Sequence, residues 1–180
     1  RARLLGLYFD TNKCFLLPTA LDDVQSLKKL YDANHPSALL VVGHTDTTGD
    51  PSINDPLSLE RAESLRAYLT DDADGWLVWY GPNVAPAKRW GTVEDHHMLS
   101  KLPDGATRPS AEAQVHWFQR TRGLVPTGVA DNDTRDALVR EYMAIYGAAL
   151  PSGVHITTHG CGESFPIHDA TIGDEQAKQL

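Results

Sequence analysis

The chain has 180 residues, which suits one domain or two small ones. Its formal net charge of −8 and sequence pI of about 5.4 argue against a nucleic-acid binder and against electrostatic attachment to anionic lipid. Apolar residues make up 41% of the sequence, enough for a core, and no apolar run approaches the roughly 18 residues that indicate a membrane span.

The predicted elements alternate between strands and helices in the first half of the chain. Residues 4–9 form a short apolar run that predicts a buried strand, and residues 18–31 carry apolar side chains at helical spacing. Residues 38–43 predict a second buried strand. Asp55-Pro56 predicts the start of the next helix, with Asp as the cap and Pro at the first helical position. Residues 154–158 predict a third strand, so the pattern indicates an α/β (α+β) sandwich with helices packed on a mixed sheet.

A long segment, residues 71–152, separates the second helix from the third strand. A structureless loop of that length is improbable inside a compact domain. The segment has its own helical pattern and aromatic anchors, which include Trp76, Trp90, Trp117 and Phe118, and such rings at helical spacing usually form a core. We therefore predict an inserted small helical subdomain at 71–152, within a discontinuous domain formed by residues 1–70 and 153–180.

The most informative polar residues follow the second predicted strand. Asp46 lies just past its carboxyl end, where open α/β sheets usually present ligands. Arg61 follows on the next predicted helix. A carboxylate and a guanidinium on neighbouring elements suit a zwitterion, because the acid can accept an ammonium and the Arg fork can bind a carboxylate. The alternative for an arbitrary Asp and Arg is a surface salt bridge, which contributes little to the stability of the fold.

The order of motifs around these two residues favours the ligand site. Gly43-His44-Thr45-Asp46 is followed by Asn54, Leu57-Ser58 and Arg61-Ala62, and this order resembles the signature of the OmpA-like (OmpA/MotB C-terminal) peptidoglycan-binding domain. Three further segments resemble the same family in the right order. They are the Y-F-D-T-N-K run at 8–13, the predicted helix at 18–31 and the G-C-G-E-S-F-P-I run at 160–167.

The resemblance implies a βαβαβ fold and a ligand, the meso-diaminopimelate of the peptidoglycan stem peptide. By resemblance, Asp46 would hold its ammonium and Arg61 its carboxylate, Thr45 and Asn54 would line the pocket, and Asp10 would lie beside it. We expect Arg61 on the first turns of its helix, where helix-terminal N–H groups would also face the anion. We interpret His44 as a residue that fixes its loop by hydrogen bonding, and Glu163 as a plain turn residue.

Part of the inserted segment resembles a second family. The run Ala113 to Arg120 contains W-F-Q, and Gly123-Leu124, Thr127-Gly128 and a T-x-x-A-L pattern at 134–138 follow it. This order is similar to the "peptidoglycan-binding domain 1" repeat, a small bundle of three helices. Direct contact with the wall and packing against the neighbouring domain both remain open for this segment.

Catalytic and metal-binding patterns are absent from the sequence. No G-x-S-x-G, H-E-x-x-H or Walker-type loop occurs. His155, His159 and Cys161 are the densest candidate ligands for zinc, but a strand would spread them over about 13 Å or more. We therefore expect no metal site, no cofactor and no catalysis. For Cys14 and Cys161, a disulfide and two buried thiols are equally open alternatives.

The chain departs from the OmpA-like pattern near its end. The family closes with an N-R-R-V-type segment and a last strand, whereas residues 171–180 carry no such pattern, so we expect the last strand to be absent and an exposed sheet edge to permit an edge-strand dimer. Because the chain begins at Arg1, we expect a segment of a longer polypeptide.

The function that these patterns predict is non-catalytic anchoring of a larger protein to peptidoglycan. The expected location is the periplasm or cell envelope, with outer-membrane association if the chain is part of a longer protein. Two alternatives stay open: a protein-interaction module of a larger secreted or injected effector, and a metal-dependent wall amidase or peptidase.

Overall fold

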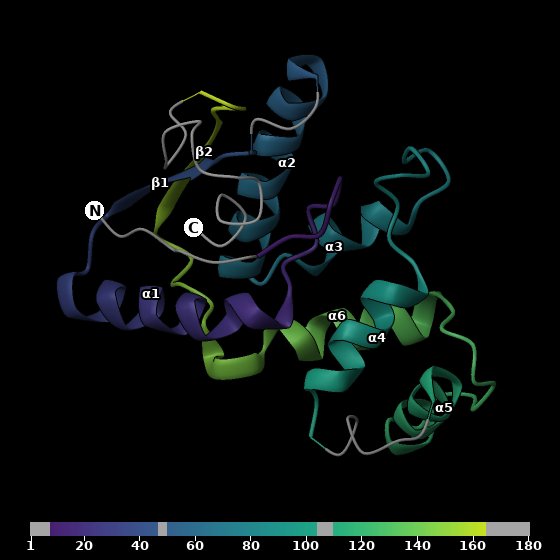
Figure 1. The fold of residues 1–180 in the computed structure, drawn as a ribbon. Helices are drawn as coiled ribbons and strands as arrows, with labels where there is room; N and C mark the ends of the chain where they lie inside the picture. Colours follow the sequence, from purple (N-terminus) through teal and green to yellow (C-terminus); the bar gives the residue numbers. More distant parts are fainter. Residues whose placement is uncertain (1–7, 47–49, 104–109, 165–180) are drawn as a thin grey trace.

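The structure, a computed structural model, describes residues 8–46, 50–103 and 110–164 (Figure 1). The elements in chain order are η1 (Pro18–Ala20), α1 (Leu21–Asn34), β1 (Ala38–Gly43), α2 (Pro51–Leu69), α3 (Ala73–Leu77), η2 (Val78–Tyr80), α4 (Thr92–Lys101), α5 (Ala111–Thr121), α6 (Asn132–Met143), η3 (Ile145–Gly147) and β2 (His155–Gly160). Helices and strands occur together, which confirms the predicted α+β class. None of the described helices combines the length and the apolar character needed to cross a membrane.

Within the described residues the sheet consists of two parallel strands. β1 pairs with β2 from Ala38 opposite His155 to Gly43 opposite Gly160, and α2 packs on both strands (Figure 1). Most of the strand predicted at 4–9 lies outside the described residues, and its described end, Tyr8 and Phe9, is irregular. Residues 171–180 also lie outside them. The missing last strand and the edge-strand dimer therefore stay predictions.

The strand predicted at 38–43 is confirmed, but the prediction that it is buried is wrong. Leu40 and Val42 are 65% and 40% exposed, whereas Leu39 and Val41 pack against the core. Successive side chains of a strand point to opposite faces of the sheet. Among the described residues, α2 covers β1 on one face, so this apolar run has one buried face and not the two that it suggested.

The second predicted helix begins earlier than expected. α2 starts at Pro51 with Asp50 as its cap, and the Asp50 carboxylate accepts a hydrogen bond of 2.8 Å from the backbone N–H of Ser52. Asp50-Pro51 is the same capping pair as Asp55-Pro56, five residues upstream, and the earlier pair is the one used. Pro56 consequently lies inside the helix.

The buried aromatic rings form a core, as their helical spacing predicts. Trp76 and Phe118 are fully buried and Trp90 is nearly so. The Trp76 ring lies 5.5 Å from Phe15, 5.2 Å from Trp90 and 5.9 Å from Tyr142, measured between ring centroids. One hydrophobic cluster thus runs from residues 14–17 and α1 into α3, α4 and α6. The proposed boundaries of the inserted subdomain at 71–152 therefore stay a prediction.

Candidate functional site

The carboxyl ends of β1 and β2 lie unusually close to α2. A Cβ atom on Gly43 would lie 1.9 Å from the carbonyl oxygen of Ser58, so only glycine permits this approach. The fully buried Ser58 hydroxyl donates to the carbonyl of Asp55 at 2.7 Å and accepts from the N–H of Gly162 at 2.9 Å. The helix is thereby attached to the turn that follows β2.

The backbone pairing continues beyond the two strands. The N–H of Cys161 donates to the carbonyl of Gly43, and the N–H of Thr45 donates to the carbonyl of Gly162, both at 3.0 Å. Thr45 immediately precedes Asp46, which is half-buried. The turn after β2 therefore sets the course of the chain that carries the predicted acid.

Arg61 projects from the middle of α2 and is held by the loop at residues 9–13. Its Nε donates to the carbonyl of Lys13 at 3.1 Å and its Nη2 donates to the carbonyl of Asp10 at 3.2 Å. The guanidinium carbon lies 5.1 Å from the centroid of the Phe9 ring, a cation–π contact. These contacts orient a long side chain that would otherwise rotate freely.

Loss of hydration and the charge of Asp46 shift the pKa of Arg61 in opposite directions. Burial lowers the pKa of Arg61, while the Asp46 carboxylate raises it. A guanidinium stays protonated in proteins. Arg61 is therefore a poorly hydrated cation, and this strengthens its attraction for an anion, while the charge of Asp46 offsets part of that attraction.

One expectation about Arg61 is wrong. Because α2 begins at Pro51, Arg61 lies ten residues from the helix start, about 15 Å along the axis. The N–H groups of the helix terminus therefore do not accompany Arg61. Asn54 lies in the first turns instead, where its N–H donates to the carbonyl of Asp50 at 3.0 Å.

Asn54 is buried at 5% exposure and is paired with a residue far along the chain. Its Nδ2 donates to Oε1 of Glu163 at 2.7 Å, across 109 positions of sequence. The interpretation of Glu163 as a plain turn residue missed this contact. The signal for it was present, because the late G-x-G-E run and Asn54 belong to the same order of motifs.

Two side-chain atoms of the loop after β1 are buried without a hydrogen-bond partner in the described part of the chain. They are Nδ1 of His44 and Oγ1 of Thr45. The loop-fixing bond expected of His44 is thus not made by Nδ1. Buried polar atoms are normally paired, so these two have hydrogen-bonding capacity that the described residues do not use.

Asp10 connects the loop to the inserted helices. Its carbonyl accepts from Arg61, while its carboxylate lies 3.6 Å from Nε2 of His97 on α4. Nearby, the Lys13 ammonium lies 3.2 Å from the buried Glu94 carboxylate at the start of α4. An open hollow of about 480 Å³ lies between this loop and α4. We call Asp10, Thr45, Asp46, Asn54, Arg61 and Glu163 the strand-end site.

The two cysteines are free thiols in the structure, so the disulfide alternative is not realised. Cys14 is 1% exposed, and Cys161 is half-buried. Burial, followed by the charge of Glu60, raises the pKa of the Cys14 thiol well above its ordinary value. This thiol is therefore an unreactive core group.

The residues considered as zinc ligands, His155, His159 and Cys161, do not form a cluster. Among the described residues, no three or more His, Cys, Asp or Glu side chains are placed to hold a metal ion. The Nε2 atom of His155 instead lies 3.4 Å from the hydroxyl of Thr157.

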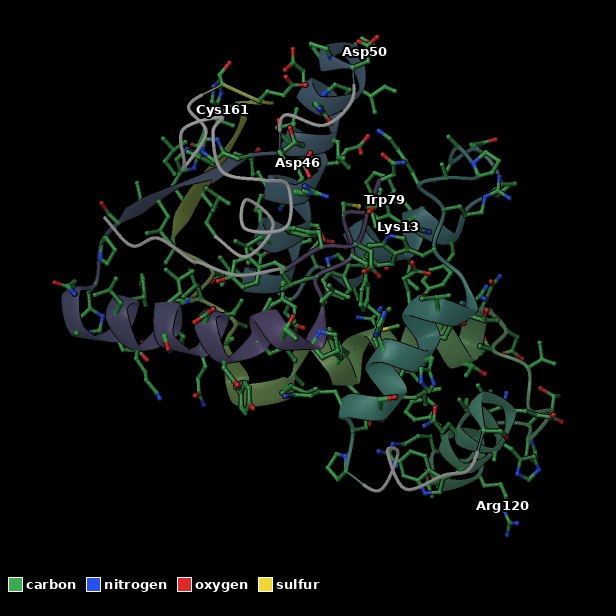
Figure 2. All side chains as sticks on the ribbon, viewed as in Figure 1. Lys13, Asp46, Asp50, Trp79, Arg120 and Cys161 are labelled. Carbon is green, nitrogen blue, oxygen red and sulfur yellow. The ribbon has the colours of Figure 1, made fainter. Side chains whose placement is uncertain are left out.

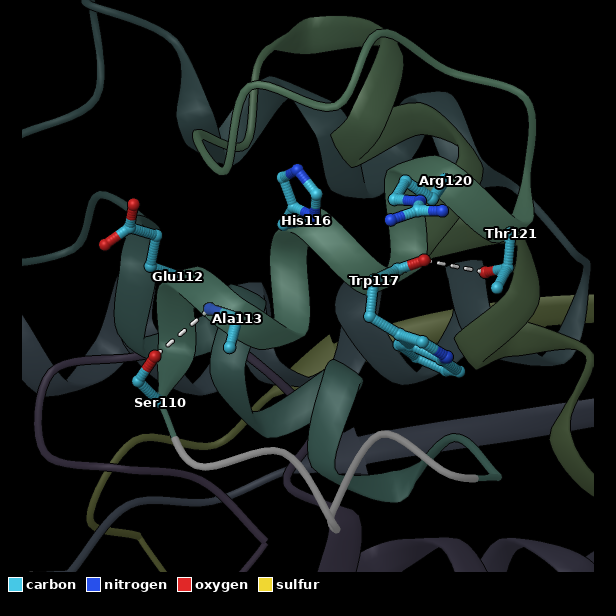
Figure 3. A pocket seen from close by; sticks show the side chains of 7 residues that line it. All are labelled: Ser110, Glu112, Ala113, His116, Trp117, Arg120 and Thr121. Atoms are coloured by element: carbon cyan, nitrogen blue, oxygen red, sulfur yellow. Dashed lines mark hydrogen bonds between the residues drawn. The ribbon is translucent and has the colours of Figure 1, made fainter.

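A second open hollow, of about 700 Å³, lies along α5. Its lining includes Glu112, His116, Trp117 and Arg120, and His116 and Arg120 project from the same side of the helix (Figure 3). Ser110 caps α5 through a bond of 3.1 Å to the N–H of Ala113. Figure 2 shows Asp46 in the upper part of the view and Arg120 at its lower right, so this hollow is remote from the strand-end site.

Two family models match the chain. Residues 8–76 match the OmpA family, and residues 95–138 match a model described as "Putative peptidoglycan binding domain", which confirms both resemblances. The first range contains five of the six residues of the strand-end site, and the second contains α5 and its hollow. No curated protein and no solved structure matches the chain. The two matches support peptidoglycan binding and association with the cell envelope or cell wall.

Proposed function

We propose, from the matches to the OmpA family and to a peptidoglycan-binding module, that the strand-end site binds the diaminopimelate residue of the peptidoglycan stem peptide. The supporting observation is the state of Arg61. Its guanidinium is half-buried and oriented by two backbone carbonyls, and the charge of the Asp46 carboxylate raises its pKa. A free amino-acid end of diaminopimelate offers the matching pair, one carboxylate and one ammonium.

Each side chain of the site has a role in this proposal. Arg61 binds the ligand carboxylate, because charge-assisted bonds from a guanidinium are the strong ones. Asp46 accepts the ammonium. The buried hydroxyl of Thr45 and the amide of Asn54 contribute neutral hydrogen bonds. Asp10 orients Arg61 through its carbonyl and adds negative charge at the rim.

The module acts as an anchor without catalysis. A site built from so few groups binds one stem peptide modestly, but polymeric peptidoglycan presents many copies and raises the apparent affinity through avidity. The anchored object is a larger protein of which this chain is a module. The place of action is the periplasmic face of the cell wall, with outer-membrane association for a protein that also has a membrane part.

The test is co-sedimentation with insoluble diaminopimelate-type peptidoglycan. We expect wild type to sediment and Asp46→Ala and Arg61→Ala to stay in solution, since loss of a charge-assisted contact costs about 2 kcal/mol or more. Free meso-diaminopimelate should release the wild-type protein, while 1,5-diaminopentane, which keeps the two ammonium groups but has no carboxylate for Arg61, should release much less.

Matched controls separate the site from general surface charge. Arg66→Ala removes an arginine of α2 that pairs with Asp72 and whose side chain is 36% exposed, and Asp74→Ala removes a carboxylate that is 91% exposed. Both controls should sediment like wild type. Equal sedimentation of all five proteins would move the binding away from the strand-end site. No sedimentation of wild type would overturn the proposed function.

A further inference from the structure

The turn after β2, at Gly162 and Glu163, makes three separate contacts with α2 and with the loop after β1. Gly162 donates to the hydroxyl of Ser58 and accepts from the N–H of Thr45, and Glu163 accepts from Asn54. A Cβ on Gly162 would lie 1.9 Å from a carboxylate oxygen of Asp55, and its φ of +53° is left-handed. The turn is therefore packed against α2 in a conformation that glycine alone adopts without strain.

The Glu163 carboxylate constrains which way the Asn54 amide is turned. An ionised carboxylate only accepts hydrogen bonds, so Asn54 must present its Nδ2 donor to Glu163. The Oδ1 acceptor then lies on the other side of the amide group. Without the carboxylate, this contact no longer opposes a half-turn of the buried amide, which would exchange the two atoms.

We propose that Glu163 is a positioning residue of the diaminopimelate pocket, a role that rests on the function proposed above. It holds Asn54 with its acceptor oxygen directed away from Glu163, and in the proposed complex one lone pair of that oxygen accepts from the ligand ammonium. The adjacent Gly162 carbonyl holds Thr45 and so sets the start of the segment that carries Asp46. Ligand recognition in the first part of the chain thus depends on a turn more than 100 residues away.

The experiment measures peptidoglycan affinity for Glu163→Ala, Glu163→Gln, Asn54→Ala and the Asn54→Ala/Glu163→Ala double variant. We expect Glu163→Ala to bind about tenfold more weakly, the loss of roughly one charged hydrogen bond. Glu163→Gln should recover part of this affinity, because a glutamine carbonyl also accepts from Asn54 but does not enforce the orientation. Since Glu163 acts through Asn54, the double variant should bind like Asn54→Ala alone.

Two further measurements keep the inference separate from folding. Thermal unfolding of each variant shows whether the protein is folded at the temperature of the assay. Glu63→Ala, at an exposed position of α2, is the matched control and should bind like wild type.

The outcomes distinguish this inference from the proposed function. If wild type binds, Asp46→Ala and Arg61→Ala do not, and folded Glu163→Ala binds like wild type, the role of Glu163 is overturned while the site stands. Strictly additive losses in the double variant would also overturn it, because a general structural effect adds and a shared contact does not. Absence of wild-type binding overturns both.

Discussion

The inserted helices and the strand-end site are held together in different ways. α5 and α6 begin at side-chain caps, Ser110 and Asp131, that bond to the backbone three residues on, and Trp76 and Phe118 fill the core beneath. The strand-end site has little apolar packing of its own. Instead, its polar groups are held in place by hydrogen bonds between residues that lie 48 to 109 positions apart in the sequence.

This difference shows where stability and recognition reside. The helices supply most of the core residues. Burial of their aromatic rings is non-directional and tolerates small shifts. A site for a zwitterion requires fixed directions, which hydrogen bonds provide. Arg61 lies where the two meet, because the loop that orients it also continues into the aromatic core at Phe15.

The largest expected effect is on the aromatic side of this comparison. Trp76→Ala should lower the free energy of unfolding by about 3–5 kcal/mol, since it removes a fully buried ring. It also removes the indole donor that bonds to the carbonyl of Ser64 at 3.0 Å. Urea unfolding measures the change, with Val78→Ala, at a position 61% exposed, as the near-neutral control. A loss below about 1 kcal/mol would mean that this ring is not central to the core.

The second largest effect is expected on both stability and peptidoglycan binding, from a change at Gly43. Gly43→Ala places a methyl group 1.9 Å from the carbonyl oxygen of Ser58, so α2 must move away from β1. We expect a loss of about 1–3 kcal/mol in stability from overpacking, together with weaker peptidoglycan binding because Arg61 moves with α2. Gly153→Ala is the matched control, since no atom lies within 4 Å of its added Cβ. Unchanged binding in a destabilised Gly43→Ala would separate stability from recognition.

The smallest effect is the pH dependence of one helix cap. Hydrogen bonds from the hydroxyl and the N–H of Thr134 lower the pKa of Asp131 below its usual range. The cap charge therefore stabilises the folded protein above the pKa of about 3.9 for an unfolded aspartate, and this contribution disappears as the pH falls through the lowered folded value. Asp131→Asn keeps a capping oxygen without a titrating charge.

The Tm of wild type and of Asp131→Asn should accordingly differ most near neutral pH and converge in acid. Thermal unfolding from pH 7 down to about pH 2 measures this difference. A difference that is constant with pH would show that the cap acts without its charge.

Particular elements show how far the sequence could be interpreted. The strand at 38–43 and the helix beginning near Pro18 were predictable because apolar spacing is a local property. The start of α2 was predicted at the second of two Asp-Pro pairs, and local preference does not choose between two equivalent caps. The burial of β1 was predicted wrongly, since which face is covered depends on where α2 packs.

By itself, the sequence determined the class of fold, the helical nature of the inserted segment and the identities of Asp46, Asn54 and Arg61 as candidate ligand groups. These follow from spacing and from the order of motifs. Only the tertiary structure decided that Arg61 is oriented by the carbonyls of Asp10 and Lys13, and that Asn54 is oriented by Glu163. The reason is physical. A hydrogen bond depends on distance and direction in space, and every residue has a backbone carbonyl, so the sequence does not show which acceptor a side chain will reach.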